Sequence, residues 1–230
     1  RRQRQMCIRD RDKERTIIHL KLNVGGKPDA NTKDLAYWHY SVHNPKSAVS
    51  HFEGAVVNIN ASDFYSENIS YVNDWGLEAQ NGPQALALKT KADRIAFYNC
   101  KFRSFQDTWM TTTRDADRHY VKECWLEGAV DYFYGGGNAL VEESTLYNVR
   151  SGSVIVAPCH ESVKYGYVFR NCVIDGNEQA ADGKLKLGRP WHNSPKAVYV
   201  NTLVKIPLAP EGWTNMGTIP AVSYTHLTLP

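Results

Sequence analysis

Short alternations of apolar and polar residues recur along the chain, and no long stretch has the 3.6-residue period of an amphipathic helix. Six segments share one pattern: an aromatic or aliphatic start, then Asn or Glu, then a second short alternating run. They are FYSENISYVNDWG, FYNCKFRSFQDTW, YVKECWLEGAVDYF, LVEESTLYNV, YVFRNCVIDG and VYVNTLVKI. Because β-branched and aromatic residues favour strands, the pattern predicts short strands rather than helices.

The Asn or Glu within each segment marks a repeat. These anchor residues follow one another at intervals of 20 to 31 residues: Asn68, Asn99, Glu123, Glu143, Asn171 and Asn201. Irregular intervals of this size indicate a solenoid whose coils carry loops of variable length. We therefore expect an all-β fold, a right-handed single-stranded parallel β-helix. A β-sandwich is the competing fold, but the anchored repeat argues against it.

Three cysteines, Cys100, Cys124 and Cys172, each follow an anchor directly. Cysteine at an equivalent interior position behaves as a small buried hydrophobe, so the spacing predicts a stacked interior ladder. A disulfide between neighbouring coils is the alternative. These cysteines and Cys159 form no CxxC pair and no other metal-ligand spacing, so we expect no metal.

The two ends of the chain differ from the rest. MCIRD at residues 6–10 and VSYTH at residues 222–226 can be encoded by reverse-complementary DNA, which resembles a transposon end used in sequencing libraries. We expect residues 1–11 and 222–230 to be non-native tails. Residues 12–221 would then form one β-helix domain, truncated at both ends. Because solenoids need capped ends, we expect this fragment to be poorly soluble.

Charge changes when the tails are set aside. The full chain has 27 basic and 24 acidic residues, a formal net charge of +3. Residues 1–11 contain five arginines and one aspartate, and residues 222–230 contain no formal charge, so the remainder has 22 basic and 23 acidic residues, a net charge of −1. We therefore expect no nucleic-acid partner. No apolar run approaches the ~20 residues of a membrane span, so no membrane partner is expected either.

Two aspartates occupy equivalent places in successive coils. Asp107 follows Cys100 by seven residues, and Asp131 follows Cys124 by seven residues. Adjacent parallel strands lie about 4.8 Å apart, so one aspartate is predicted to stack nearly over the other. Two carboxyl groups at that separation titrate as a coupled pair, and we expect one pKa to rise while the other stays low. One protonated acid and one anionic base or nucleophile would result.

Further polar residues complete a candidate site. Arg189, in LGRPWHN, can hold a carboxylate with its guanidinium fork. The amides of Gln106 and Gln84 can stabilise a developing oxyanion, typically by ~3–4 kcal/mol each. Together these groups favour ester hydrolysis through an acyl-enzyme. A two-carboxylate glycosidase is the alternative, but it has no obvious need for two glutamines.

Four blocks in this order, GPQALALK, FQDTW, VDYFYGGGNA and LGRPW, resemble the pectin methylesterase (pectinesterase) family over most of residues 55 to 205. The resemblance implies a right-handed parallel β-helix that hydrolyses methyl esters of polygalacturonate without a cofactor. It implies that Asp131 is the nucleophile and that Asp107 is the general acid and then base. Gln84 and Gln106 would stabilise the oxyanion, and Arg189 would orient Asp131.

The resemblance also places substrate-binding residues. Trp191 would line a sugar subsite, and Tyr134 and Trp109 would face the substrate. Met110 stands where the family has an aromatic residue, so the wall of the cleft differs there. Tyr134 stands where the family block DFIFG has its second phenylalanine. We further expect a secreted or periplasmic monomer whose partner is pectin (homogalacturonan).

Two other functions stay open: an esterase or thioesterase with a non-pectin acyl substrate, and a non-catalytic β-helix that binds polysaccharide. His119 and His160 lack a nucleophile elbow and are expected to be surface or core residues. The triple glycine, Gly135 to Gly137, precedes a predicted strand rather than a helix, so it does not predict a phosphate loop.

Overall fold

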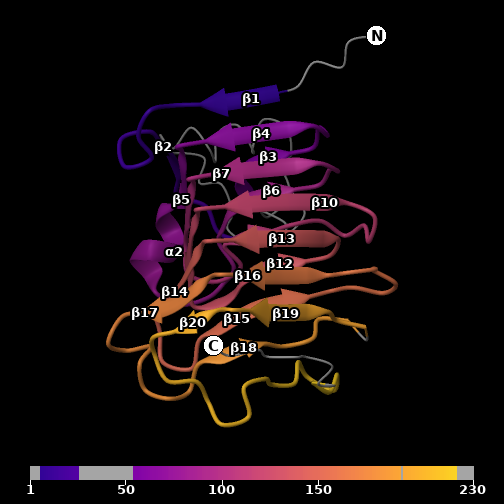
Figure 1. The fold of residues 1–230 in the computed structure, drawn as a ribbon. Coiled ribbons are helices and arrows are strands. Elements are labelled where there is room, and N and C mark those ends of the chain that lie inside the picture. Colours follow the sequence, from indigo (N-terminus) through magenta and orange to yellow (C-terminus); the bar gives the residue numbers. More distant parts are fainter. Residues whose placement is uncertain (1–5, 26–53, 193, 222–230) are drawn as a thin grey trace.

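A computed structural model describes residues 6–25, 54–192 and 194–221 of the chain. The described residues form three parallel sheets that stack coil upon coil along one axis (Figure 1). Each coil adds one strand to each sheet in turn, as in the coil of β7, β8 and β9. The strand pairings between coils are all parallel, which excludes the antiparallel β-sandwich. The predicted parallel β-helix is confirmed.

Sheet A contains, in spatial order, β1 (Met6–Arg9), β4 (Phe64–Glu67), β7 (Ile95–Tyr98), β10 (Arg118–Lys122), β13 (Asn138–Glu142), β16 (Tyr167–Arg170) and β19 (Ala197–Val200). Sheet B contains β2 (Ile17–Leu20), β5 (Ser70–Asn73), β8 (Lys101–Arg103), β11 (Trp125–Gly128), β14 (Thr145–Asn148), β17 (Val173–Gly176) and β20 (Leu203–Val204). Sheet C contains β3 (Ala55–Ile59), β6 (Leu86–Thr90), β9 (Trp109–Met110), β12 (Val130–Gly135), β15 (Val154–Pro158) and β18 (Lys186–Gly188).

One short helix, α2 (Asp74–Ala79), leaves the stack between β5 and β6 (Figure 1). The side chain of Asn73 caps it by accepting the N–H of Trp75 at 3.1 Å. The helix ends at Gln80, which has a left-handed backbone (φ 50°). Among the described residues, no helix has the length and apolarity needed to cross a bilayer.

The six anchor residues of the repeat are the corners between sheets A and B. Each has a positive φ between 48° and 60°: Asn68, Asn99, Glu123, Glu143, Asn171 and Asn201. In this conformation the chain turns sharply within one residue, and Asn tolerates it better than most side chains do. The repeated Asn is therefore explained by backbone geometry at this corner in the six coils that follow the first.

The residue after each corner points into the solenoid. This interior ladder contains the three cysteines that were predicted to stack, and its members are at most 3% exposed: Ile69, Cys100, Cys124, Ser144, Cys172 and Thr202. The N–H of Cys100 donates to Sγ of Cys124 at 3.3 Å, and the N–H of Cys124 donates to Oγ of Ser144 at 3.0 Å. All the cysteines are free thiols, so the structure has the ladder and not the disulfide.

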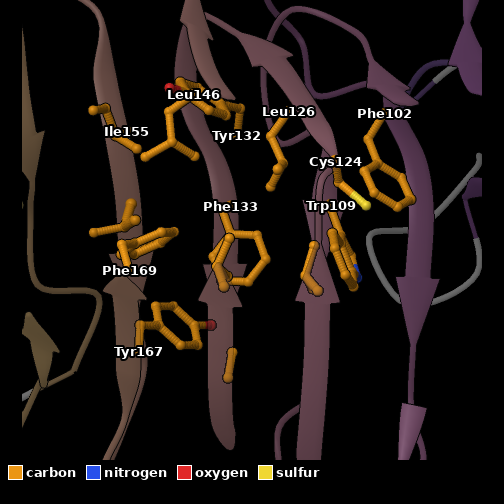
Figure 2. Packing of buried hydrophobic residues seen from close by; sticks show 14 of the residues in the cluster. Phe102, Trp109, Cys124, Leu126, Tyr132, Phe133, Leu146, Ile155, Tyr167 and Phe169 are labelled. Atoms are coloured by element: carbon orange, nitrogen blue, oxygen red, sulfur yellow. The ribbon is translucent and has the colours of Figure 1, made fainter. Parts of the chain in front are cut away.

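The core is a column of rings stacked along the axis (Figure 2). The ring of Trp109 lies 4.6 Å from that of Phe102 and 5.1 Å from that of Phe133, centroid to centroid. Such aromatic pairs contribute about 0.5–1.5 kcal/mol each beyond the burial of their area. Phe102 and Trp109 lie in sheets B and C of one coil, and Phe133 lies in sheet C of the next coil, so this packing holds the two sheets and the two coils together.

The first described strand, β1, pairs with β4 at the edge of sheet A, and its four side chains are exposed. An unpaired edge accepts the backbone of almost any segment, so this pairing does not decide whether residues 1–11 are native. Their assignment as a non-native tail stays a prediction. The second predicted tail, residues 222–230, lies outside the described residues.

Candidate active site

The two aspartates lie on neighbouring coils in the predicted register. Gln106 pairs with Val130, and the N–H of Asp107 donates to the carbonyl of Val130 at 2.9 Å. Asp107 is therefore level with Asp131 one coil away. Both have a positive φ, 61° and 50° respectively. The same local bend therefore recurs at both carboxylates. Most L-residues avoid this left-handed conformation, but aspartate is among those that adopt it.

Arg189 holds the second aspartate from two strands further along sheet C. It follows β18, and its N–H donates to the carbonyl of Val156 at 2.9 Å. Its Nε donates to Oδ1 of Asp131 at 2.9 Å, and its Nη2 donates to Oδ2 at 2.6 Å. This two-bond fork fixes both oxygens of the carboxylate and favours its charged form.

Burial and the guanidinium separate the two acids. Burial raises the pKa of Asp107 well above its usual range, and the charge of Asp131 raises it further. Burial also raises the pKa of Asp131, but the hydrogen bonds and charge of Arg189 oppose that rise. The expectation that one of the two pKa values stays low is therefore wrong: both are raised, and that of Asp107 is raised more. Asp107 keeps its proton to a higher pH than Asp131 does, because only Asp131 is bonded to the guanidinium.

The two glutamines face the same pocket as the acids. This pocket has a volume of about 220 Å³ and is open on one side; it is lined by Gln84, Gln106, Asp107, Asp131, Tyr134, Ala157, Arg189, Trp191 and Met216. Neutral amide donors beside a forked carboxylate and a protonated acid are the groups that acyl transfer from an ester requires.

Tyr134 and Trp191 form an aromatic wall, with ring centroids 5.7 Å apart. The hydroxyl of Tyr134 is buried and makes no hydrogen bond of standard length and angle among the described residues. Burial raises the pKa of Tyr134, and the nearby charges of Asp107 and Asp131 raise it further. The hydroxyl thus lies in the field of both carboxylates, and it is close enough to Asp107 to oppose the rise in the pKa of that carboxyl.

The pectinesterase family model matches residues 38–225. The chain belongs to the pectinesterase family. Pectinesterase 31 of Arabidopsis thaliana is 36% identical over 166 residues, which cover 71% of this chain and 49% of the relative. The crystal structure of the pectin methylesterase from Aspergillus niger has a TM-score of 0.64 at 31% identity, covering 71% of this chain and 53% of that one. This chain therefore spans about half the length of such pectinesterases.

A more distant pectinesterase confirms the fold over a larger part of the chain. The structure of the rice weevil pectin methyl esterase has a TM-score of 0.76 at 23% identity, and covers 94% of this chain and 68% of that one. At this identity the likeness shows the parallel β-helix and no more.

The structure contradicts one predicted substrate contact. Trp109 is fully buried and points into the core (Figure 2). Its indole N–H donates to Oγ1 of Thr90 at 3.1 Å. Side chains alternate along a strand, so in β9 the tryptophan faces inward and Met110 faces the pocket side. A bound polysaccharide cannot reach the indole.

Met110 does not contact a substrate directly either. It is 1% exposed and packs in a small cluster with Tyr134, Ala157 and the partly buried Trp191 and Met216. It pairs with Tyr134 across sheet C. Its role here is to support the aromatic wall from below, which corrects its prediction as a substrate-binding residue.

The pocket also has members that the repeat analysis missed. Met216 lines it from the segment that follows β20. Because this segment has no repeat pattern and methionine is uncharged, the sequence did not point to Met216 as a pocket residue. Arg150 lies outside the lining, but its charge opposes the raised pKa of Asp131. Its guanidinium lies 5.9 Å from the ring centre of Phe105. Arg150 is thus a second cation that acts on Asp131, and the sequence analysis did not predict it.

His119, His160 and the triple glycine do not line the candidate active site. His119 and His160 are buried in the structure, 4% and 0% exposed. A Cβ at Gly135 would approach the carbonyl oxygen of Thr112 within 2.8 Å, so the triple glycine serves close packing of two coils. Within the described ranges, no cluster of three or more His, Cys, Asp or Glu could hold a metal ion.

Proposed function

We propose that this chain is a carboxylic ester hydrolase that removes methyl esters from polygalacturonate in pectin. One observation carries the proposal. Asp131 is gripped by the fork of Arg189 and stacked on Asp107, whose pKa burial and Asp131 raise. A charged carboxylate beside a protonated one, with two amides facing the same pocket, supplies nucleophile, acid and oxyanion donors together.

In this mechanism Asp131 attacks the ester carbonyl and forms an acyl-enzyme. The amides of Gln84 and Gln106 stabilise the oxyanion, and the proton of Asp107 passes to the leaving methanol. Asp107, now charged, takes a proton from water, which attacks the acyl-enzyme and restores Asp131. Arg189 keeps Asp131 charged and oriented between the two steps. The order of the two pKa values supports this division of roles.

The proposal includes the substrate, the cofactor requirement and the location of the protein. The substrate is the homogalacturonan of pectin, and Trp191 stacks on one of its sugar rings. No cofactor takes part. We infer that the protein acts as a secreted or periplasmic monomer, because a polymer of the cell wall lies outside the cell. The family membership supports the polysaccharide substrate.

The deciding test is methanol release from highly esterified pectin. Asp131→Ala is expected to lower the rate by more than 1,000-fold, an order of magnitude typical of loss of a covalent nucleophile or its partners. Asp175→Ala, which removes a half-buried carboxylate paired with Lys205, serves as the control and should keep the rate.

Other outcomes point elsewhere. Release of alcohol from an aryl ester or thioester but not from pectin would favour a different acyl substrate. Binding of pectin without turnover of any ester would favour a non-catalytic polysaccharide-binding β-helix. Asp131→Ala activity within tenfold of the unmodified chain would contradict a nucleophilic role for Asp131.

A further inference from the structure

A second pocket adjoins the candidate active site across Trp191. It has a volume of about 370 Å³ and is lined by Thr113, Asp115, Cys159, Glu161, Trp191 and His192. The indole of Trp191 lines both pockets, so the two are neighbouring parts of one groove. A polymer that places one sugar over Asp131 and continues past Trp191 enters this second pocket.

The second pocket, which we call the acidic pocket, lacks the guanidinium that pairs with a carboxylate in the first. Two carboxylates, Asp115 and Glu161, line it, and no lysine or arginine does so among the described residues. Both charges are felt inside: burial raises the pKa of Cys159 to about 11, and Asp115 and Glu161 add to the rise. The cationic side chains Arg189 and Arg150 act instead on Asp131, whose raised pKa they oppose.

The acidic groups are held in place by the local backbone. Oδ2 of Asp115 accepts the N–H of Ser162 at 2.5 Å and that of Glu161 at 3.3 Å, and it also accepts the hydroxyl of Ser162 at 3.2 Å. The loop after β15 is thereby tied to the loop after β9. Asp115 has a structural role as well as a charge, whereas the side chain of Glu161 is exposed and free to face a ligand.

A chain of free galacturonates is a polyanion, and it would be repelled by a pocket with two carboxylates. A methyl-esterified galacturonate is neutral and escapes that repulsion. We propose that the pocket beyond Trp191 is a sugar subsite that selects a methyl-esterified galacturonate next to the ester being hydrolysed, with Glu161 as a specificity-determining residue. This inference rests on the proposed function. It adds the esterification state that the neighbouring sugar must have.

The test compares methanol release from two pectins of equal length, one highly esterified and one randomly saponified to about half. The measured quantity is the ratio of kcat/KM between them, expressed per remaining ester. The unmodified chain is expected to favour the highly esterified pectin. Glu161→Gln should narrow this preference about threefold, mainly by raising kcat/KM on the saponified pectin. A threefold change in kcat/KM is half of a tenfold change on the free-energy scale, and an effect of this size is typical of one exposed charge.

Two controls keep the test sharp. Glu143→Gln makes the same change of charge at the corner between sheets A and B, away from the groove, and should leave the ratio unchanged. Salt provides a second arm, since a preference that arises from charge shrinks when the Debye length falls from about 10 Å at 0.1 M to about 3 Å at 1 M. Asp115→Asn keeps an acceptor for the loop and should narrow the ratio as well.

The outcomes separate the two proposals. Methanol release with a ratio that neither Glu161→Gln nor salt alters would overturn the subsite and leave the proposed function standing. A preference of the unmodified chain for the saponified pectin would overturn it too. No methanol from either pectin would overturn the proposed function, and the subsite with it.

Discussion

Tyr134 has a hydroxyl at a position where the resemblance to the family implies phenylalanine. The hydroxyl is buried, makes no hydrogen bond of standard geometry, and lies close enough to Asp107 to oppose the rise in the pKa of that carboxyl. A protonated Asp107 has its own hydrogen to donate. Once Asp107 has lost that proton, its carboxylate can accept a full hydrogen bond from the hydroxyl of Tyr134. The residue is therefore placed to favour the charged form of Asp107 after proton transfer.

Tyr134→Phe should raise the pKa of Asp107, because it removes a donor to the charged form. In the proposed mechanism Asp107 must be protonated before methanol leaves, so the alkaline limb of the kcat/KM profile should move up by about half to one pH unit. The profile with pectin as substrate measures this shift. Tyr165→Phe changes an exposed ring and is the control. An alkaline limb that stays in place would remove Tyr134 from this role.

The residue scale also shows what the sequence could reveal about the site. Asp107 and Asp131 could be paired in advance because both follow an interior cysteine by seven residues, and the coil converts equal spacing into equal height. Trp109 was misplaced because a motif does not say which side of the sheet each residue faces. The αL bend at Asp107 resets the alternation, so that the tryptophan turns inward. Met216 comes from a segment without repeat marks, and no spacing announces it.

At the scale of the element, the corner between sheets A and B is the most regular feature. Four of its six positions have Asn, and two have Glu, Glu123 and Glu143, in the same left-handed conformation. A left-handed backbone costs ordinary L-residues about 1–2 kcal/mol and costs Asn less. Glu at a corner is therefore a local conflict that the stack of sheets overrides.

Glu143→Asn should stabilise the protein by about 0.5–1 kcal/mol, because it relieves that conflict. The change also removes an exposed ion pair with Lys122 at 3.4 Å, which contributes little. Urea unfolding measures the difference. Asn201→Glu, the reverse change at the last corner, should destabilise the protein by a similar amount. If Glu143→Asn were neutral or destabilising, the corner would not be limited by backbone strain.

The elements explain why the fold was predictable and its details were not. The corners demand Asn-like residues and the interior ladder demands small ones, so the coil repeat is visible in the sequence. The lengths of the segments between sheets B and C carry no such demand. Helix α2 occupies one of them, and its capping Asn73 lies inside a run that alternates like a strand. Local pattern alone therefore gave no helix there.

At the scale of the whole molecule, the long core contains two histidines that must stay neutral. Burial lowers the pKa of both His119 and His160 to about 4, below the value of about 6.5 expected in an unfolded chain. Between these pH values the unfolded state binds more protons than the folded state does. Their contribution to stability is complete above about pH 6.5 and is lost as the pH falls to about 4.

His119→Phe should therefore flatten the acid side of the stability curve, by about 1.4 kcal/mol per pH unit between pH 4.5 and 6. The change suits the core, since Thr90 keeps its other hydrogen bonds to Thr111 and Trp109. Urea unfolding at a series of pH values gives the slope. His192→Gln, an exposed position, should leave it unchanged. Asp107 opposes the histidines in this window, because its raised pKa favours the folded state as the pH falls.

The one-residue corner has a consequence for how such a molecule can change. Because six successive coils turn from sheet A to sheet B within one left-handed residue, that edge has no room for extra chain after the first coil, whose strands β1 and β2 are joined by residues 10–16. In these six coils extra length can enter only on the two other edges, and both of them border sheet C, where α2, Arg150 and the loops of Asp115 and Glu161 lie. Variation in the length of the chain is thus confined to the loops on either side of sheet C. Loops grafted beside sheet C should alter which polymers fit the groove and leave the stack intact.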